Sequence, residues 1–370
     1  MSDPAAHPEQ PAETIRLRPA LENLPAYIAG KPAADDGIHR YKVSSNESHL
    51  PPIPSVRDAA VAAMESSNRY PDASAQQLRA ALGQKHGVDP AQIALSTGSV
   101  AVSGDLVRAV VGEGDEVVFA WRSFEAYPIL VGSHGGTPVP VPLTAAGEHD
   151  LEAMAAAVTE RTRLVLLCTP NNPTGPSLST EQVEDFLARV PEDVVVAIDE
   201  AYREFHDPAT VLGTAGIFRR HGNVVLLRTF SKLQGLAGLR IGYAVAHPPV
   251  IEGLLKAVIP FGVTDLSQAA ALESLKHWDE VIERAGEIAQ TRDAFAAALR
   301  EQGWDVPEAQ ANYVWLPLGE KSDAFEDACV EQAVAVRNLG TGVRISIGED
   351  EALARVLEIA ERFRVEHFAE

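Results

Sequence analysis

The sequence predicts an α/β protein in which helices cover both faces of a sheet, followed by a smaller α+β unit. Two observations predict this fold class. Seven short apolar runs, most of them rich in β-branched residues, recur between residues 93 and 245, and helix-like stretches lie between them. Several runs are apolar throughout, as expected of strands that are covered on both faces. Strand–helix alternation of this kind is typical of an α/β sheet, which we place at roughly residues 48–260.

The individual elements follow from local patterns. The runs predicted as strands are Ile93–Leu95, Glu116–Ala120, Pro138–Val141, Arg163–Cys168, Val194–Ile198, Val224–Leu227 and Ile241–Val245. Helical patterns lie at Gln76–His86 and Gln182–Val190, and Ser179 with Gln182 fits a capping box for the second. From about residue 263 the pattern changes to helices at Leu266–Lys276, Asp279–Gln302 and Glu349–Arg364, with short strands near Asn312–Leu316 and Val343–Ile347.

The composition disfavours several classes of partner. The formal net charge is -21, and no stretch rich in lysine or arginine interrupts the acidity. Nucleic acid and anionic membranes repel such a surface, so we expect the chain to bind neither. Only two cysteines are present, Cys168 and Cys329, which argues for a reducing compartment and against disulfides or a thiolate metal site. No apolar stretch is long enough to span a bilayer, and we expect a cytoplasmic protein without a metal site.

Four polar clusters directly follow predicted strands. In open α/β sheets, ligands bind in the crevice at the carboxyl ends of the strands. Ordinary loops do not explain four such clusters easily, so we place the functional site there. The clusters are Ser96-Thr97-Gly98-Ser99, Thr169-Pro170-Asn171-Asn172-Pro173, Asp199-Glu200-Ala201-Tyr202 and Thr229-Phe230-Ser231-Lys232.

Lys232 is the candidate nucleophile. It lies in the stretch Arg228-Thr-Phe-Ser-Lys-Leu-Gln-Gly-Leu-Ala-Gly-Leu-Arg240, after a buried strand and among apolar residues. Desolvation and neighbouring cations can hold such a lysine neutral, which Schiff-base chemistry with an aldehyde requires. Taken alone, a solvated lysine that opens a glycine-rich loop is the more common case.

Asp199 ends an apolar strand, where a carboxylate is costly unless a cation pairs with it. A pyridinium N–H is such a partner, and the pair keeps the ring an electron sink. The alternative is that Asp199 caps the next helix. Tyr202 could reach the same site from the first turn of that helix.

Gly98-Ser99-Val100 lies between a strand and the helix-like segment Ala101–Val110. Free backbone N–H groups at a helix start bind anions, and Ser231 and Arg240 could add a hydroxyl and a cation. By itself this glycine–serine pair is a weak signal, because it matches neither a Walker loop nor a dinucleotide fingerprint.

Four further residues carry chemistry that has a structural alternative. Asn172 could donate to a phenolate oxygen or form a polar turn, and Phe124 could stack on a flat ring or pack in the core. Arg344 lies in a predicted strand, so it requires a carboxylate, supplied either by a ligand or by a structural salt bridge. Arg337 precedes it in the same unit.

Together these residues resemble the class I/II aminotransferases over about residues 17–364. The residues that carry the resemblance are Asn-Asn-Pro-Thr-Gly, then Asp-Glu-Ala-Tyr, then Ser-Lys followed by Gly-Leu-Arg-Ile-Gly-Tyr. The resemblance implies the fold type I of aspartate aminotransferase, with a seven-stranded, mostly parallel sheet and a small α+β domain, and the cofactor pyridoxal 5′-phosphate. The polar, proline-rich residues 1–14 predict a disordered tail. The expected domains are an N-terminal arm at 15–47 that joins the small domain, a large cofactor-binding domain at 48–262 and a small domain at 263–370.

The family's roles carry over position by position. Lys232 would bind the cofactor covalently and move the substrate proton, Asp199 would pair with the pyridine nitrogen, and Tyr202 would bind the ring oxygen. Asn172 would bind that oxygen too, and Phe124 would stack on the ring. The resemblance assigns the phosphate to Gly98, Ser99, Val100, Ser231, Arg240 and, from a second subunit, Tyr70. It assigns the substrate to Arg344, Arg337, Asn46 and Tyr27.

Within the family, the chain resembles the histidinol-phosphate branch, and more closely the actinobacterial aromatic aminotransferases. Residues 121–128, 310–319 and 336–344 carry the closer resemblance, and Pro260-Phe261-Gly262-Val263 has fewer polar groups than the histidinol-phosphate enzymes carry there. It implies a homodimer that transfers the amino group of phenylalanine or tyrosine to 2-oxoglutarate. Histidinol-phosphate transamination is the alternative, followed by a decarboxylase of the same fold. A non-catalytic module fused to a regulator is disfavoured by the negative charge, and we expect no DNA-binding extension. The effect of Leu233-Gln234, which departs from the family pattern, stays open.

Overall fold

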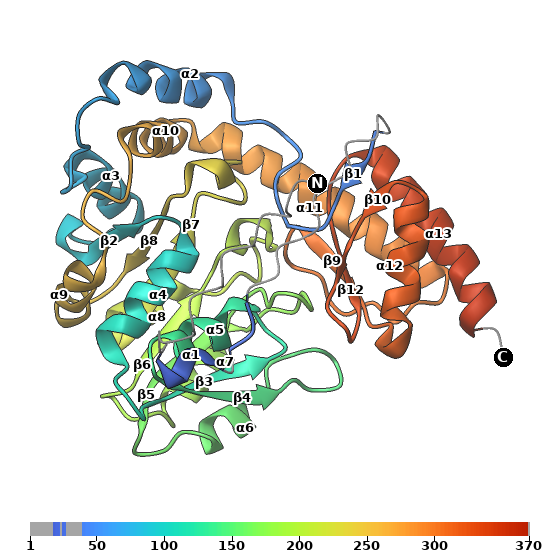
Figure 1. Cartoon of the computed structure of the whole chain (residues 1–370), viewed down its shortest axis with the longest axis horizontal. Coiled ribbons are helices and arrows are strands. Elements are labelled where there is room, and N and C mark those ends of the chain that lie inside the picture. The colour runs from blue at the N-terminus through green and yellow to red at the C-terminus, as the bar shows by residue number, and fades with distance from the viewer. Residues whose placement is uncertain (1–17, 23, 27–38, 369–370) are drawn as a thin grey trace, which may run out of the picture.

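The computed structural model describes residues 18–22, 24–26 and 39–368, and its centre is a seven-stranded sheet (Figure 1). The strand order is β2-β8-β7-β6-β5-β3-β4. β8 is antiparallel to both of its neighbours, and all other pairs are parallel. The strands are β2 (Ile93–Ser96), β3 (Glu116–Trp121), β4 (Thr137–Pro142), β5 (Thr162–Cys168), β6 (Val195–Asp199), β7 (Val224–Thr229) and β8 (Gly242–Val245). The seven-stranded, mostly parallel sheet expected from the sequence is confirmed.

Helices cover both faces of this sheet. Alternate strand residues point to opposite faces, and here the residues on both faces are apolar, so both faces are packed against helices. Val117 and Phe119 of β3 pack with one set of helices, whereas Val118 and Ala120 pack with the other. The first set is α4 (Ser99–Val110), α5 (Ala126–Ser133) and α9 (Pro248–Ala257). The second is α3 (Gln76–His86), α6 (Leu151–Ala156), α7 (Thr180–Leu187) and α8 (Thr214–Arg220). The capping box of Ser179 and Gln182 at the start of α7 is confirmed.

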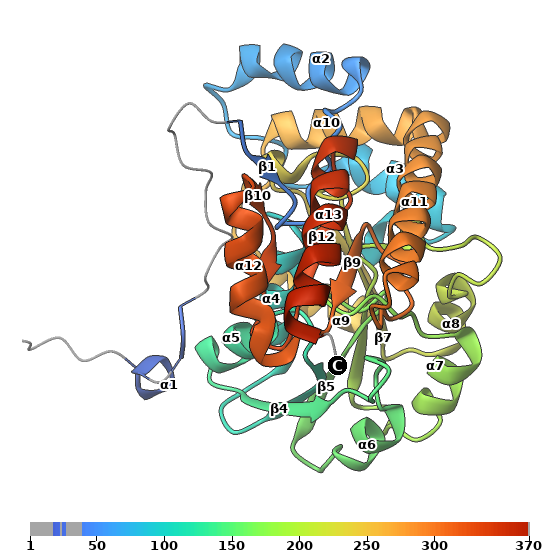
Figure 2. The same cartoon turned by 90° about the vertical axis from the view of Figure 1, so that its right-hand side faces the viewer.

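A second unit lies beside the large sheet, coloured orange to red in Figures 1 and 2. Its three-stranded sheet has the order β11-β12-β9 and is antiparallel. Its elements are α11 (Trp278–Glu301), β9 (Tyr313–Leu316), α12 (Ser322–Glu331), β10 (Val334–Ala335), β11 (Arg337–Asn338), β12 (Val343–Ser346) and α13 (Asp350–Phe368). The helices and the two longer strands predicted after residue 263 are therefore present.

The N-terminal segments pack against both units. β1 (Tyr41–Lys42) pairs in parallel with β10, which ties residues 41–43 to the second unit. α2 (Pro54–Ala63) packs against α10 (Asp265–Lys276) on the outside of the large sheet (Figure 1). α1 (Pro19–Glu22) contacts α5. The domain boundaries stay a prediction, and residues 1–17, 23, 27–38 and 369–370 lie outside the described part of the chain. Within that described part, no helix is long and apolar enough to cross a membrane.

Gly242 is where β8 meets the loop that begins α4. A Cβ atom on Gly242 would lie 2.5 Å from the backbone nitrogen of Ser99 and 2.9 Å from the carbonyl oxygen of Arg228. All the atoms it would meet are backbone, so the loop or the sheet would have to move.

We therefore expect Gly242→Ala to destabilise the protein by about 1–3 kcal/mol, as overpacking does. Thermal unfolding of the purified variant measures this. Gly286→Ala is the matched control, because Gly286 lies in α11 with open space around its Cβ position. That change should be neutral or stabilise by up to about 1 kcal/mol. Equal melting temperatures for the two variants would contradict the packing argument.

Candidate active site

A cavity of about 300 Å³ opens at the carboxyl edge of the large sheet. It lies where the strands β5, β6 and β7 end and where α4 begins. This is the edge at which ligands bind in open α/β folds. Nine of the sequence-predicted residues line it: Ser99, Val100, Phe124, Asn172, Asp199, Tyr202, Ser231, Lys232 and Arg240. The structure therefore brings together residues that lie up to 141 positions apart (240 minus 99).

Lys232 lies three residues after the end of β7, with its amine inside the cavity. Its Nζ donates to the carbonyl oxygen of Ser45 (3.3 Å) and lies 5.6 Å from the ring centre of Tyr202. Burial, together with the nearby guanidinium of Arg344, lowers the pKa of Lys232 to about 8. A substantial fraction of the amine is thus neutral near physiological pH, as a nucleophile must be.

Asp199 is the last residue of β6, and its carboxylate is buried in the cavity wall. It accepts hydrogen bonds from the hydroxyl of Tyr127 (2.7 Å) and from the backbone nitrogen of Ala201 (3.2 Å). Burial raises the pKa of Asp199, which the Tyr127 hydrogen bond partly offsets. The helix that follows is a short 3-10 helix, Arg203–Phe205, whose N-cap is Tyr202, so the alternative in which Asp199 caps the next helix is wrong.

Tyr127 is a residue that the sequence analysis missed. It lies in α5, one turn after Phe124, and the rings of Phe124 and Tyr127 meet edge to face at 5.5 Å. One short segment therefore supplies both the aromatic side chain that lines the cavity, Phe124, and the hydroxyl that donates to Asp199, that of Tyr127. The signal available in the sequence was the Phe-Glu-Ala-Tyr spacing, but its link to Asp199 spans 72 positions.

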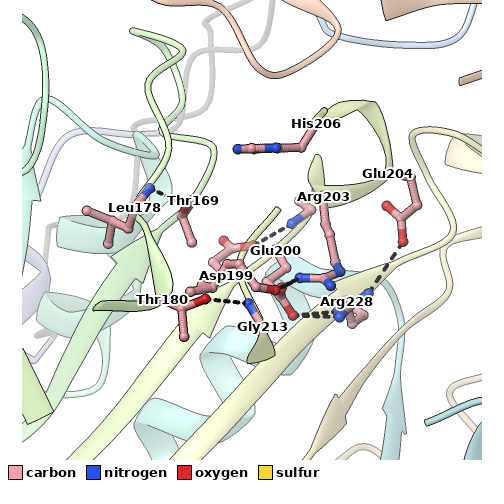
Figure 3. A network of polar contacts seen from close by, with 12 residues as sticks. Thr169, Leu178, Thr180, Asp199, Glu200, Arg203, Glu204, His206, Gly213 and Arg228 are labelled. Carbon is pink, nitrogen blue, oxygen red and sulfur yellow. Dashed lines mark hydrogen bonds and ion pairs between the residues drawn. The ribbon is translucent and has the colours of Figure 1, made fainter. Parts of the chain in front are cut away.

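The tip of β6 is held in place by an ion-pair network on the side of the strand opposite Asp199 (Figure 3). Glu200 is 1% exposed and accepts from Arg228 of β7 (2.7 Å) and from Arg203 (2.8 Å). Arg228 also lies 3.4 Å from Glu204. Buried charges are tolerated when they are paired in this way. The network joins β6 to β7 near the strand ends that position Asp199 and Lys232.

The loop before α4 forms an anion cradle with Arg240. Gly98 is the N-cap of α4 and has φ 92°, a conformation that glycine adopts without strain. A Cβ atom there would lie 2.5 Å from Nη2 of Arg240. The guanidinium thus lies over the start of the helix, where free N–H groups and the helix dipole favour an anion. Tyr70 lies outside this cavity, with 82% of its surface exposed, and packs against Phe261.

Asn46 joins the second unit to the cavity. Its amide donates to the hydroxyl of Tyr202 (3.0 Å), while its own oxygen accepts from the hydroxyl of Ser346 (2.9 Å). Asn46 was predicted to contact the substrate, and in this structure it orients Tyr202. Tyr27, the other predicted substrate contact from the N-terminal arm, lies outside the described residues.

Arg344 of β12 lies behind the cavity wall and contacts Asn172, which lines the cavity. It donates to the side-chain oxygen of Asn172 and to the carbonyl oxygen of Ser44 (2.8 Å). Its Nε is buried and has no hydrogen-bond partner among the residues that the structure describes. An unsatisfied buried N–H is costly, and a carboxylate ligand would satisfy it. Because Asn172 accepts from Arg344 through its oxygen, its NH₂ group is left to donate.

Arg337 lies directly opposite Arg344 in the antiparallel pair β11–β12. Its role predicted from the sequence is substrate binding. In the structure it donates to both carboxylate oxygens of Glu125 (2.9 and 3.1 Å), so it is already engaged by an anion. Glu125 was not predicted as a site residue, because its contact with Arg337 spans 212 positions.

The residues present fit pyridoxal 5′-phosphate. The cavity combines a lysine whose pKa is lowered to about 8, a buried carboxylate, an aromatic side chain and an anion cradle at a helix start. These are the groups that an aldehyde, a pyridine ring nitrogen, a flat ring and a phosphate require.

The comparisons with known proteins agree with this site. The chain belongs to the class I and II aminotransferases, whose family model matches residues 39–359. Members of this family are pyridoxal-phosphate enzymes, so the chain is a pyridoxal-phosphate-dependent aminotransferase.

Its relatives match over nearly the whole chain. It is 51% identical to an aromatic amino acid aminotransferase of Streptomyces coelicolor, over 95% of this chain and 98% of the relative. The identity to an aromatic amino acid aminotransferase of Rhodococcus opacus is 50%, over 91% and 93%. Among solved structures, a histidinol-phosphate aminotransferase of Sinorhizobium meliloti in complex with pyridoxal-5′-phosphate is 28% identical, with a TM-score of 0.83 over 94% of this chain and 98% of the other.

The lowered pKa of Lys232 gives a testable pH dependence. The neutral amine is the form that attacks an aldehyde, so covalent capture of pyridoxal phosphate by the cofactor-free protein should accelerate as pH rises, with a midpoint near 8. Borohydride reduction at each pH followed by mass spectrometry measures the captured fraction. Removing the positive charge in Arg344→Gln should move the midpoint upward, because that charge is the second-largest cause of the lowered pKa.

Lys232→Ala should abolish the borohydride-reducible link. The control is Lys256→Ala, at an exposed position paired with Glu252 on α9, and it should change nothing. A reducible link that persists in Lys232→Ala, or a midpoint above pH 10 in the unaltered protein, would contradict the assignment.

Proposed function

We propose that this chain transfers the amino group of phenylalanine or tyrosine to 2-oxoglutarate. The observation that carries the proposal is the nearness of Arg344 to Lys232. The buried Nε of Arg344 has no hydrogen-bond partner among the described residues, and the charge of Arg344 helps to lower the pKa of Lys232, whose side chain lines the cavity. An α-carboxylate at Arg344 would place the rest of an amino or oxo acid near Lys232. The two relatives at about 50% identity are both named aromatic amino acid aminotransferases, which supports the aromatic donor.

In this proposal the residues divide the work. Pyridoxal phosphate, when bound, supplies an electron sink for the bond broken at the substrate Cα. Asp199 pairs with the ring nitrogen, which offsets the cost of burying this carboxylate. Tyr202 and Asn172 donate to the ring oxygen, and Phe124 stacks on the ring. Lys232 holds the cofactor and afterwards moves the proton to and from the substrate Cα.

The phosphate of the cofactor is assigned to the cradle at the start of α4. Backbone N–H groups of Ser99 and Val100, the hydroxyl of Ser231 and the guanidinium of Arg240 surround that end of the cavity. The two cysteines, Cys168 and Cys329, are free and buried, which supports our proposal of a cytoplasmic location.

Discrimination between substrates is the first test. Burying a phenyl side chain contributes about 1.5–3 kcal/mol, roughly a tenfold to hundredfold preference. We expect kcat/KM for phenylalanine and tyrosine to exceed that for histidinol phosphate and for aspartate, with 2-oxoglutarate as acceptor. Steady-state kinetics on this donor panel measures it. If histidinol phosphate proves the best donor by tenfold or more, the aromatic assignment is wrong and the phosphate-specific activity replaces it.

We further propose that the enzyme works as a homodimer with shared sites. Apolar side chains are exposed at the end of α9 and just after it: Leu255, Ile259 and Phe261, with the exposed Tyr70 packed on Phe261. A symmetric dimer would cover this face twice at one interface. Tyr70, 82% exposed beside Phe261, is then available to the phosphate cradle of the partner.

Sedimentation and activity test the dimer together. The unaltered protein should sediment as a dimer, and Phe261→Asp should shift it toward monomer with loss of activity, because a buried unpaired charge opposes association. Val365→Asp is the matched control, since Val365 is 68% exposed on α13, far from this face (Figure 1). A fully active monomer at assay concentration would overturn the proposal.

A further inference from the structure

Glu125 connects the aromatic wall of the cavity to the small sheet. It directly follows Phe124, which lines the cavity, and it precedes α5. Its carboxylate accepts from Nη2 of Arg337 with both oxygens, at 2.9 and 3.1 Å, and from Nε at 3.3 Å. The pair is largely withdrawn from solvent, with exposed side-chain fractions of 12% for Arg337 and 26% for Glu125. Charge-assisted, two-point contacts of this kind are among the stronger hydrogen bonds in proteins.

Arg337 is close to the residue that is suited to hold the substrate. Arg337 and Arg344 are directly opposed in the β11–β12 ladder, and directly opposed residues of an antiparallel pair point to the same face. Two neighbouring cations attract dianions. Here Arg344 would bind an α-carboxylate, and Arg337 would bind a second carboxylate or a phosphate. The charge of Glu125 neutralises the second cation.

We propose that Glu125 is a specificity-determining residue whose carboxylate occupies Arg337 in place of the second negative charge of a substrate. A donor with an uncharged aromatic side chain leaves the Glu125–Arg337 pair intact and needs only Arg344. A dianion must compete with Glu125 for Arg337 and is repelled by the displaced carboxylate. The pair therefore favours monocarboxylate ligands over dicarboxylates and phosphates. This inference rests on the proposed function, because it assigns the selectivity of that same site.

Removing the charge of Glu125 tests the proposal directly. In Glu125→Gln, Arg337 loses its competitor, so the ratio of affinities for a dicarboxylate and a monocarboxylate should rise roughly tenfold. The measurement uses the holoenzyme and two inhibitors, glutarate and 3-phenylpropionate, and compares their inhibition constants. In turnover, KM for 2-oxoglutarate should fall, and kcat/KM for histidinol phosphate relative to phenylalanine should rise.

Three further variants make the result specific. Glu113→Gln removes the same charge from an exposed loop position and should leave the ratio unchanged. Arg337→Gln should weaken glutarate more than 3-phenylpropionate and raise KM for 2-oxoglutarate. In the double variant Glu125→Gln/Arg337→Gln, the gain seen with Glu125→Gln alone should disappear, because there is no free cation left to bind the second charge.

The outcomes separate this inference from the proposed function. If Glu125→Gln leaves the glutarate to 3-phenylpropionate ratio within about threefold of the unaltered enzyme, the inference is overturned, whatever the preferred donor. A purely structural ion pair would lower stability and both affinities together, and that result also overturns it. If Glu125→Gln does not fold, Arg337→Gln decides the question through its effect on the same ratio. Failure of the unaltered enzyme to use aromatic donors would instead contradict the proposed function.

Discussion

The buried carboxylate of Asp199 is the constraint on which the rest of the site depends. A lone carboxylate away from water costs several kcal/mol, and here burial raises its pKa. The chain itself supplies two hydrogen bonds, from Tyr127 and from the backbone of Ala201, but no cation that bonds to it among the described residues. A protonated ring nitrogen would complete its environment. The carboxylate is thus arranged to be stable with the cofactor present, and it would keep the ring able to accept electrons.

The sheet makes this arrangement rigid. β6 is a central strand, and Glu200, the residue after Asp199, forms ion pairs with Arg228 of β7 and with Arg203 (Figure 3). Lys232 leaves β7 three residues after its end, so the lysine and the carboxylate are held by neighbouring strands. Groups on neighbouring strands of one sheet keep their separation more precisely than groups on independent loops.

The side of the site that we propose for the substrate depends on contacts between the two units. Arg344 of the small sheet donates to Asn172 of the large one, and Asn46 joins Ser346 to Tyr202. The Glu125–Arg337 pair spans the same boundary. Movement of one unit relative to the other would change all three contacts together, whereas Asp199 would keep its hydrogen bonds from Tyr127 and Ala201. Because Asn172 and Tyr202 are also the residues that we propose for the ring oxygen, these contacts would couple cofactor binding to substrate binding.

Much of this could be predicted from the sequence, for identifiable reasons. Most of the strands in the large sheet are buried on both faces, so their residues are largely apolar, and polar clusters follow four of them; the edge strand β4 is the partly exposed exception. The short strands β1, β10 and β11 carry no such pattern, because two residues cannot show a period and the pairing of β1 with β10 is purely tertiary. Tyr127 and Glu125 were missed for the same reason: their importance lies in partners 72 and 212 positions away. The role of Asn46 as a support for Tyr202 also required the fold.

The protonation state of the cofactor nitrogen tests the central claim most directly. We would reconstitute the protein with pyridoxal phosphate labelled with ¹⁵N in the ring and measure the nitrogen chemical shift across neutral pH. In the unaltered protein we expect the chemical shift of a protonated pyridine nitrogen, because Asp199 pairs with that nitrogen. In Asp199→Asn we expect the chemical shift of a neutral pyridine nitrogen. A neutral ring nitrogen in the unaltered protein at pH 7, or no difference between the two proteins, would contradict it.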